Sequence, residues 1–393
     1  MASPRLISGS FSRTYLCAAA ALLASFVLAV PAIVEAQTYT FSSLYSFQGT
    51  SGEYPLGGVV VDSKGNLYGT TSEGGVYGNG TVFKVTATGK ETVLHSFKGG
   101  VSDGEFPEAG LIRDSASNLY GTTTLGGAAG YGTVFKVTAK GEETVLHSFG
   151  QTKDDGRYPS ASLTFDSKGD LYGTTQQGGA AGFGTIFKVD GNGKETIVHN
   201  FAGNPNDGQY PVQSMIRDSK GNFYGATELG GAVNDGTIFK LDSLGNETVL
   251  FSFVGGSGGS NPFGGVVVDS AGNLYGGVPY GGNGIGLIFE LDTSANETVL
   301  YTFSGSDGSY PSSNLIRDSH GNLFGTTEFG GALGAGVAFE VSSNGTETAL
   351  HNFGGSDGSD ILTPLVSDTA GNLYGTTTEG GTNGQGTVFK LSQ

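Results

Sequence analysis

The stretch "DSKGNLYGTT", residues 62–71, decides the fold because versions of it return along the whole chain. The other six copies are "DSASNLYGTT", "DSKGDLYGTT", "DSKGNFYGAT", "DSAGNLYGGV", "DSHGNLFGTT" and "DTAGNLYGTT". They begin at intervals of 49 to 52 residues, at Asp62, Asp114, Asp166, Asp218, Asp269, Asp318 and Asp368. A regular period of this length is typical of a repeat architecture.

Each repeat contains four short segments with the character of β-strands. In the second repeat they are residues 109–114, 118–123, 132–138 and 143–149. All four are rich in β-branched and aromatic residues, and none has the 3.6-residue period of an amphipathic helix. Turn residues separate them, so each repeat is predicted to form a four-stranded antiparallel meander.

The two ends of the chain predict that the repeats close into a ring. The last repeat stops after its third strand, residues 386–392, and residues 38–47 resemble the missing fourth strand. A closed propeller balances its strands in this way and leaves no unpaired sheet edge. We therefore predict an all-β fold. It is a single seven-bladed β-propeller of four-stranded antiparallel blades over residues 37–393, closed by the N-terminal strand completing the last blade.

The first 36 residues differ from the repeats. Arg5 and Arg13 precede the apolar run "LCAAAALLASFVLAV", and "VEA" at residues 34–36 offers a cleavage site. We expect residues 1–36 to be a signal peptide that is removed, and the product to be secreted, periplasmic or extracellular. Cys17, the single cysteine, would leave with it. No other apolar stretch has the ~18 residues that a membrane span needs.

The composition excludes some partners. The chain has 393 residues and a formal net charge of −17, which opposes binding to nucleic acid or to an anionic membrane. No phosphate-binding loop or cofactor motif stands out from the repeats. We expect a monomer without a cofactor.

The repeat unit, with "DSKGNLYGTT", "GTVFK", "ETVLHSF" and "DGEFP" in fixed order, resembles the GloVer repeat of Gloeobacter and Verrucomicrobia proteins. The resemblance covers almost the whole mature chain and implies an exported bacterial protein, but no established activity. Similar proteins often carry a C-terminal sorting anchor, which we do not expect after Gln393. A looser resemblance to NHL-type propellers implies that the first strand of each blade is innermost and the fourth outermost.

The aspartate of the motif is predicted to shape a turn. Its carboxylate can accept backbone N–H groups two residues on, and the following glycine can adopt a positive φ. A calcium loop would need several acidic oxygens at alternating positions, and each turn offers one or two.

Four histidines share one place in the fourth strand: His95, His147, His199 and His351. Tyr45, Phe251 and Tyr301 stand at the same place in other repeats. Because phenylalanine cannot bind a metal, we expect these flat side chains to pack between blades. We also expect the outermost strands of neighbouring blades to be too far apart to share an ion, and we predict no metal site.

The long loops are predicted to lie on one face of the ring, which is the usual place for binding. Their aromatic residues could stack on sugar rings while their carboxylates accept hydroxyl groups. The candidates are Tyr54, Asp103, Phe106, Asp155, Tyr158, Asp207, Tyr210, Tyr280, Asp307 and Tyr310. The alternative is structural: Asp-Gly makes the turn, the aromatic ring fills the gap between blades and proline begins the strand.

Three arginines, Arg113, Arg217 and Arg317, fall on first strands near the predicted channel. They could bind an anion there, or pair with nearby turn carboxylates.

No residue is predicted to be catalytic. The favoured function is a secreted binding or scaffold protein whose ligand is a glycan or a cell-surface protein, although the chain lacks Trp for sugar stacking. One alternative is an exported lyase or hydrolase with an acidic central-funnel site. Another is a structural cell-envelope module. Repeats five to seven depart most from the pattern, for example at residues 276–290, and are the expected functional sector.

Overall fold

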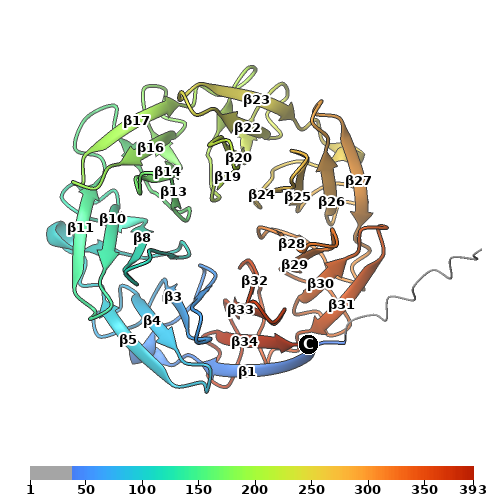
Figure 1. Ribbon diagram of the computed structural model, residues 1–393, viewed down its shortest axis with the longest axis horizontal. Helices are drawn as coiled ribbons and strands as arrows, with labels where there is room; N and C mark the ends of the chain where they lie inside the picture. Colours follow the sequence, from blue (N-terminus) through green and yellow to red (C-terminus); the bar gives the residue numbers. More distant parts are fainter. Residues whose placement is uncertain (1–37) are drawn as a thin grey trace, which may run out of the picture. The chain divides into compact units, whose positions relative to one another are not determined.

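The repeats fold into separate four-stranded antiparallel sheets arranged around a central axis (Figure 1). This computed structural model describes residues 38–393, so the predicted signal peptide lies outside the described residues. The sheets number seven, which confirms the predicted seven-bladed β-propeller. Within residues 38–393, no helix has the length and apolar character needed to cross a membrane.

Blades 1 to 6 follow one another along the chain, and each runs from its innermost to its outermost strand (Figure 1). Blades 1 and 2 consist of β2 (Val60–Val61), β3 (Leu67–Thr71), β4 (Thr81–Val85) and β5 (Glu91–Ser96), and of β7 (Ile112–Arg113), β8 (Leu119–Thr123), β10 (Thr133–Val137) and β11 (Glu143–Ser148). Blades 3 and 4 consist of β13 (Thr164–Phe165), β14 (Leu171–Thr175), β16 (Thr185–Val189) and β17 (Glu195–Asn200), and of β19 (Ile216–Arg217), β20 (Phe223–Thr227), β22 (Thr237–Leu241) and β23 (Glu247–Ser252). Blades 5 and 6 consist of β24 (Val266–Val268), β25 (Leu274–Val278), β26 (Leu287–Leu291) and β27 (Glu297–Thr302), and of β28 (Ile316–Arg317), β29 (Leu323–Thr327), β30 (Val337–Val341) and β31 (Glu347–Asn352).

Blade 7 joins the two ends of the described chain. It consists of β32 (Val366–Ser367), β33 (Leu373–Thr377), β34 (Thr387–Ser392) and β1 (Thr40–Ser46). β1 pairs antiparallel with β34 along its whole length, so the predicted closure by the N-terminal strand is confirmed. The N–H of Phe47 then donates to Gly386 O at 3.0 Å, as Phe97 N–H does to Gly80 O in blade 1. The ring therefore has no unpaired sheet edge at its junction.

The long connections pair with each other on one face of the ring. Three of the pairings are short two-stranded sheets: β6 (Gly104–Glu105) with β9 (Leu125–Gly126), β12 (Gly156–Arg157) with β15 (Gln177–Gly178), and β18 (Gly208–Gln209) with β21 (Leu229–Gly230). The same connections contain the 3-10 helices η1 (Gly49–Ser51), η2 (Gly100–Ser102) and η3 (Gly256–Gly258). In each pairing, the connection that leads into a blade lies beside the loop between its second and third strands. The predicted long-loop face is therefore confirmed.

The core lies between blades and repeats with them. Phe97, which follows β5 of blade 1, is fully buried against Phe135 of blade 2, with ring centroids 5.0 Å apart in an edge-to-face arrangement. Burial of a phenylalanine contributes about 1.5–3 kcal/mol, so such pairs hold neighbouring blades together. The glycine of the motif leaves room for a phenylalanine of the same kind, because a Cβ at Gly69 would lie 2.6 Å from the ring of Phe83.

The opening motif is a structural turn, as predicted. Asp62 Oδ1 accepts the backbone N–H groups of Lys64 and Asn66, both at 2.9 Å, and Gly65 has a φ of +75°. Asp62 Oδ2 accepts a hydrogen bond from the Tyr68 hydroxyl, and the Tyr68 ring packs against the core between blades 1 and 2.

The two threonines of the motif are buried and hydrogen-bonded. Thr70 Oγ1 donates to Ala109 O of the next blade at 2.8 Å. Thr71 Oγ1 lies 2.9 Å from Thr81 Oγ1 on the neighbouring strand. The acid, the aromatic ring and both hydroxyls therefore serve the scaffold.

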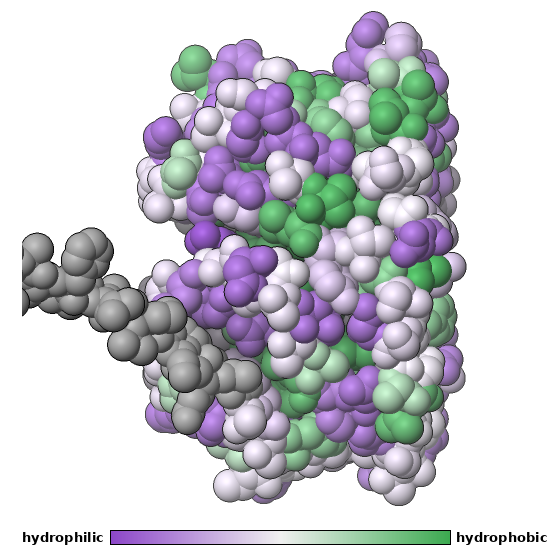
Figure 2. Space-filling model, turned by 90° about the vertical axis from the view of Figure 1, so that its right-hand side faces the viewer, coloured by the Kyte–Doolittle hydropathy of each residue, from purple (hydrophilic) through white to green (hydrophobic). Residues whose placement is uncertain are grey.

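The outer rim is in contact with solvent. In side view its surface mixes polar and apolar residues (Figure 2). The second residue of each outer strand in blades 1 to 3, namely Thr92, Thr144 and Thr196, is exposed, while the flanking residues are partly buried.

Candidate ligand site in the central channel

A cavity of about 350 Å³ opens where the long-loop face meets the central channel. Its wall contains one residue from each blade, at the position directly after the repeated proline, or after Ile361 in blade 7. These residues are Leu56, Glu108, Ser160, Val212, Phe263, Ser312 and Leu362. We name them the mouth ring. Small-molecule sites typically measure ≈ 300–1,000 Å³, so the cavity is large enough for a ligand.

The mouth ring breaks the symmetry of the scaffold. The proline beside it packs on the preceding blade, as a Cβ at Gly132 would lie 2.6 Å from Pro159 Cδ. The residue after the proline is instead leucine, glutamate, serine, valine or phenylalanine, according to the blade. Equivalent positions that carry different groups can give a ligand different contacts on each side.

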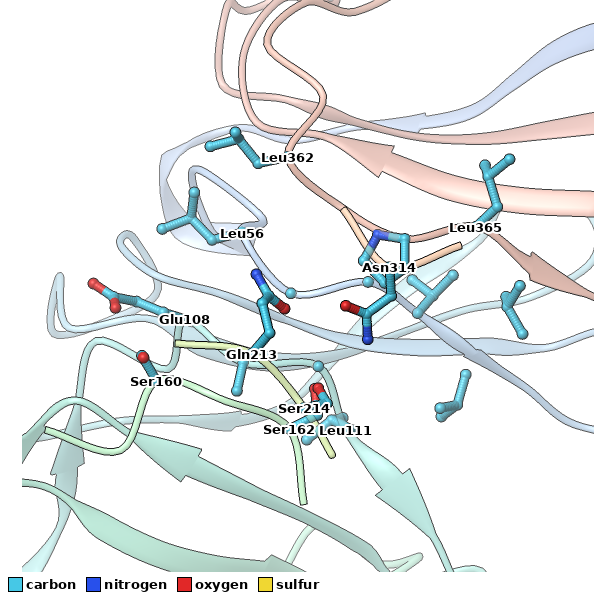
Figure 3. Close-up of a pocket in the computed structure, with 18 residues that line it drawn as sticks. Leu56, Glu108, Leu111, Ser160, Ser162, Gln213, Ser214, Asn314, Leu362 and Leu365 are labelled. Carbon is cyan, nitrogen blue, oxygen red and sulfur yellow. The ribbon is translucent and has the colours of Figure 1, made fainter. Parts of the chain in front are cut away.

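A second cavity of about 230 Å³ follows along the inner strands. Side chains from separate blades converge on it, with Leu56 and Leu362 on one side and Ser160, Ser162 and Ser214 on the other (Figure 3). Asn314 is fixed in its wall, because its Oδ1 accepts Gly265 N–H at 2.6 Å.

The mouth cavity holds two half-buried carboxylates. Burial raises the pKa of Glu108, although Thr124 Oγ1 donates to its Oε2 at 2.9 Å. Burial and then the charge of Asp360 raise the pKa of Glu328 to about 7. Gln176, whose Nε2 donates to Ser160 Oγ at 2.7 Å, adds an amide to the same wall. The site thus combines apolar surface with hydrogen-bonding groups, two of which are carboxyl groups with raised pKa values.

Two of the aromatic residues predicted from the loops lie in the cavity wall: Tyr280 and Tyr310. Their ring centroids are 5.6 Å apart, edge to face, and Tyr280 is 45% exposed. Tyr280 belongs to residues 276–290, one of the segments in which the sequence departs from the repeat.

The other predicted aromatic residues, Tyr54, Phe106, Tyr158 and Tyr210, are partly buried at blade junctions away from the cavity wall. All four and Tyr310 have φ values between 55° and 60°, in the left-handed region. Tyr158 illustrates their contacts: its N–H donates to Tyr131 O of the preceding blade at 3.0 Å, and its ring packs edge to face on Tyr131. These contacts agree with the structural alternative, in which the ring fills the gap between blades.

Four predicted acids lie beside the fourth strand of their own repeat. Asp103, Asp155 and Asp207 are buried beside His95, His147 and His199, whereas half-buried Asp307 accepts the hydroxyl of Tyr301. Burial acts to raise the pKa of Asp103, but bonds to His95, Lys98 N–H and Gly104 N–H together keep it below its ordinary value. The three buried acids lie inside the junctions and line neither channel cavity.

One argument about the outer strands was wrong. The outermost strands of neighbouring blades were expected to be too far apart to share ligands. Yet Glu143, on the outer strand of blade 2, lies with His95 and Asp103 of the blade 1 repeat in a group whose ligand atoms are within 4.8 Å of one another. The Phe97–Phe135 pair is buried between the same two blades, with ring centroids 5.0 Å apart.

The predicted channel arginines lie on the innermost strands β7, β19 and β28 but line neither channel cavity. Arg113 donates to Ser117 Oγ and lies 5.8 Å from the ring centroid of Tyr68. Arg317 lies 5.1 Å from that of Tyr275. Among the ion pairs within residues 38–393, none joins an arginine to a carboxylate. The predicted turn-carboxylate pairing is thus replaced by contacts with aromatic rings.

The sequence patterns did not point to the mouth ring, which includes Glu108, or to Gln213 and Glu328 in the same cavity wall. The signal was available, because the residue after the repeated "DG-x-YP" proline changes from repeat to repeat while its neighbours persist.

Comparison with known proteins agrees with this fold. The fold is similar to that of streptogramin B lyase, with a TM-score of 0.59 and 14% identity over 90% of this chain and 97% of that chain. It is also similar to the extracellular domain of the hybrid two-component system BT3049 from B. thetaiotaomicron, with a TM-score of 0.59, 15% identity and 91% of this chain covered. The match spans 41% of that chain. No curated protein matches this chain.

The repeat itself carries the family assignment. Residues 33–232 and 211–393 match the family model described as the Gloeobacter/Verrucomicrobia repeat. Together the two matches cover all seven blades. The chain therefore belongs to the Gloeobacter/Verrucomicrobia repeat family.

Proposed function

We propose that this protein is an exported binding protein with a β-propeller fold, and that it binds the end of a glycan chain in the mouth cavity of the central channel. The observation that carries the proposal is the mouth ring, in which seven equivalent positions of a repeated scaffold bear five different types of side chain. A structural ring has no need of this variation, whereas a ligand site does.

The chemistry of the wall favours a hydroxyl-rich ligand with an apolar face. Tyr280 and Tyr310 offer aromatic surface, and Phe263 and Val212 lie in the same wall. Glu108, Gln176, Gln213 and Glu328 supply carboxyl and amide groups for hydroxyls. Sugars present C–H faces and hydroxyl edges together, so they match this division. A segment of a cell-surface protein is the alternative ligand of the same site.

The sequence and the family support the proposed export. Residues 1–36 have the pattern of a signal peptide, and the net charge of −17 suits a protein that works away from nucleic acid. We propose a monomer in the periplasm or outside the cell.

A glycan array tests the binding function. Wild-type protein should bind a subset of glycans, and Tyr280→Ala and Gln213→Ala should each weaken binding at least 10-fold. The matched control is Tyr77→Ala, which removes an exposed loop tyrosine outside the cavity wall. Absence of binding by the wild type, or equal losses in Tyr77→Ala and Tyr280→Ala, would overturn the glycan proposal.

One observation favours an enzyme as the second candidate. Glu108 and Glu328 line a single cavity, and Glu328 has a pKa of about 7, which suits proton transfer near neutral pH. A propeller of similar fold is named a lyase, so this scaffold supports such activity elsewhere. A bound glycan that is cleaved by the wild type, but bound without cleavage by Glu328→Gln, would establish the enzyme. If the wild type binds a glycan without cleaving it, the protein is a binding protein and not an enzyme. A structural envelope module would show neither glycan binding nor glycan cleavage.

A further inference from the structure

Three blade junctions on the outer rim each bring a histidine, an aspartate and a glutamate together. The groups are His95, Asp103 and Glu143; His147, Asp155 and Glu195; and His199, Asp207 and Glu247. In each group the three ligand atoms lie within 4.8 Å of one another. The histidine and aspartate come from one repeat, and the glutamate begins the outer strand of the next blade.

In the middle group, the three atoms that face one another make no hydrogen bonds to described residues. His147 Nε2, Asp155 Oδ1 and Glu195 Oε1 are each buried, with less than 1 Å² of the atom exposed, and none has a hydrogen-bond partner within residues 38–393. The Asp155 side chain is only 7% exposed, and its Oδ1 lies 4.0 Å from His147 Nε2, beyond hydrogen-bond distance. Buried polar atoms without partners are rare in folded proteins and require an explanation.

The other two groups have the spacing of ligands around one small cation. His95 Nε2 lies 3.3 Å from Asp103 Oδ2, and His199 Nε2 lies 3.2 Å from Asp207 Oδ2. Two ligands at ~2.0–2.1 Å from a tetrahedral ion are about 3.3–3.4 Å apart. In both junctions the glutamate Oε1, of Glu143 or Glu247, is buried without a partner among the described residues, as it is at Glu91, Glu297 and Glu347 in the other blades.

The aspartates are already oriented by backbone groups, as metal ligands usually are. Asp155 Oδ2 accepts Gln151 N–H at 3.0 Å, which leaves Oδ1 directed at the histidine. In the other two junctions the aspartate Oδ2 that faces the histidine itself accepts a backbone N–H, from Lys98 to Asp103 at 2.8 Å and from Ala202 to Asp207 at 2.7 Å. The site is therefore preorganised on one side, and the glutamate of the next blade completes it.

We propose that these three junctions each bind a divalent transition-metal ion of the Zn²⁺ type, through the histidine Nε2, one aspartate oxygen and one glutamate oxygen. Imidazole with carboxylates is a donor set that suits such an ion. Water would take the remaining position. The ion joins the outer strands of blades 1, 2, 3 and 4, at a distance from the channel site.

The remaining junctions lack one member of the set and provide internal controls. Phe251 stands at the histidine position of the junction that contains Glu297. Tyr45 stands at the same position beside Glu91, and Glu347 lies near the Tyr301–Asp307 pair. His351 and Asp357 are 2.8 Å apart, but Phe41 occupies the place of the glutamate. Glutamate at this position is therefore common to most blades. Only the three proposed junctions, among those within residues 38–393, combine it with both a histidine and an aspartate.

Isothermal titration of the metal-free full chain, made without a histidine tag, with ZnCl₂ tests the proposal. We expect three Zn²⁺ ions per chain, and none in the triple variant His95→Phe/His147→Phe/His199→Phe. Phenylalanine stands at this position in blade 4, so the variant should fold, as its circular dichroism spectrum would verify. His351→Phe is the matched control and should still bind three ions.

Co²⁺ provides a second readout, because a tetrahedral site gives it visible absorption bands. The wild type should show these bands, and Glu195→Gln should lose about a third of their intensity. Failure of the wild type to bind Zn²⁺ at 100 µM, or unchanged stoichiometry in the triple variant, would overturn the proposal.

Discussion

Phe41 lies flat on His351, with ring centroids 3.9 Å apart and an interplanar angle of 8°. Phe41 pairs with Leu391, just as Glu143 pairs with Val137 in blade 2. It thus occupies the position that glutamate holds in the other blades. Strand β1, which closes the propeller, therefore has an aromatic side chain where the three candidate metal junctions have a carboxylate.

Replacement of Phe41 by glutamate should therefore create a fourth metal site with His351 and Asp357. We expect the Zn²⁺ stoichiometry of Phe41→Glu to rise from three to four in isothermal titration. Phe41→Gln, which has the same shape without the charge, should stay at three. Four ions in both variants, or three in both, would contradict the role assigned to the carboxylate.

The glutamates of the outer strands should make the metal-free protein less stable as pH rises. Burial, followed by the charge of Asp103, raises the pKa of Glu143 to about 7, above the ordinary value of 4.5. The unfolded chain releases this proton at lower pH than the folded chain, so stability falls between about pH 4.5 and 7. With a chelator present, Glu143→Gln should be as stable as the wild type near pH 4.5. At pH 8 it should be more stable by the order of 1 kcal/mol after allowance for solvent screening.

Thermal melts at the two pH values measure this difference. Asp207 and His199 lie near Glu247 as Asp103 and His95 lie near Glu143. The stability of Glu247→Gln should therefore show the same pH dependence as that of Glu143→Gln. Parallel pH profiles for the wild type and both variants would contradict the assignment.

The turn aspartates should stabilise the fold through their hydrogen bonds. Asp218 accepts Lys220 N–H, Asn222 N–H, the Asn222 side-chain amide and the Tyr224 hydroxyl. We expect Asp218→Ala to lose about 1–2 kcal/mol of unfolding free energy at pH 7 in urea titrations. Asp242→Ala removes a similar turn that has no tyrosine contact and should lose less.

The pH dependence of this loss has a defined sign. Burial acts to raise the pKa of Asp218, but its hydrogen bonds outweigh burial and lower it below 3.8. Its contribution is therefore present above the unfolded value and disappears as pH falls through the folded pKa. A loss that stayed constant down to pH 2 would contradict a role for the charged carboxylate.

The left-handed aromatic residues should tolerate asparagine better than alanine. Tyr158 has a φ of 60°, and Asn261 and Asp360 adopt the same conformation at the equivalent place in blades 5 and 7. Both Tyr158→Asn and Tyr158→Ala lose the contact with Tyr131, but asparagine adopts a positive φ at lower cost. Chemical denaturation should find the asparagine variant more stable by about 0.5–1 kcal/mol. Equal stability, or a more stable alanine variant, would show that the backbone stores no strain there.

Much of the scaffold was predictable from the repeat alone. The period gave the number of blades, and the aspartate and glycine of the motif specified a turn, because both act through bonds to residues close in sequence. The left-handed φ of Tyr54 and its equivalents was not predicted, since tyrosine rarely adopts it. Asn261 and Asp360 at the same position were the available signal.

The sequence by itself determined the blades, their order and their closure, because these depend on local strand patterning and on matching ends. Only the tertiary structure decided which residues share a site. Glu108 and Glu328 are 220 positions apart yet line one cavity, since ring closure brings inner strands from all blades to the axis. In the same way, the angle between neighbouring blades places Glu195 beside His147 and Asp155. That angle is set by phenylalanine packing between sheets, which no spacing in the sequence expresses.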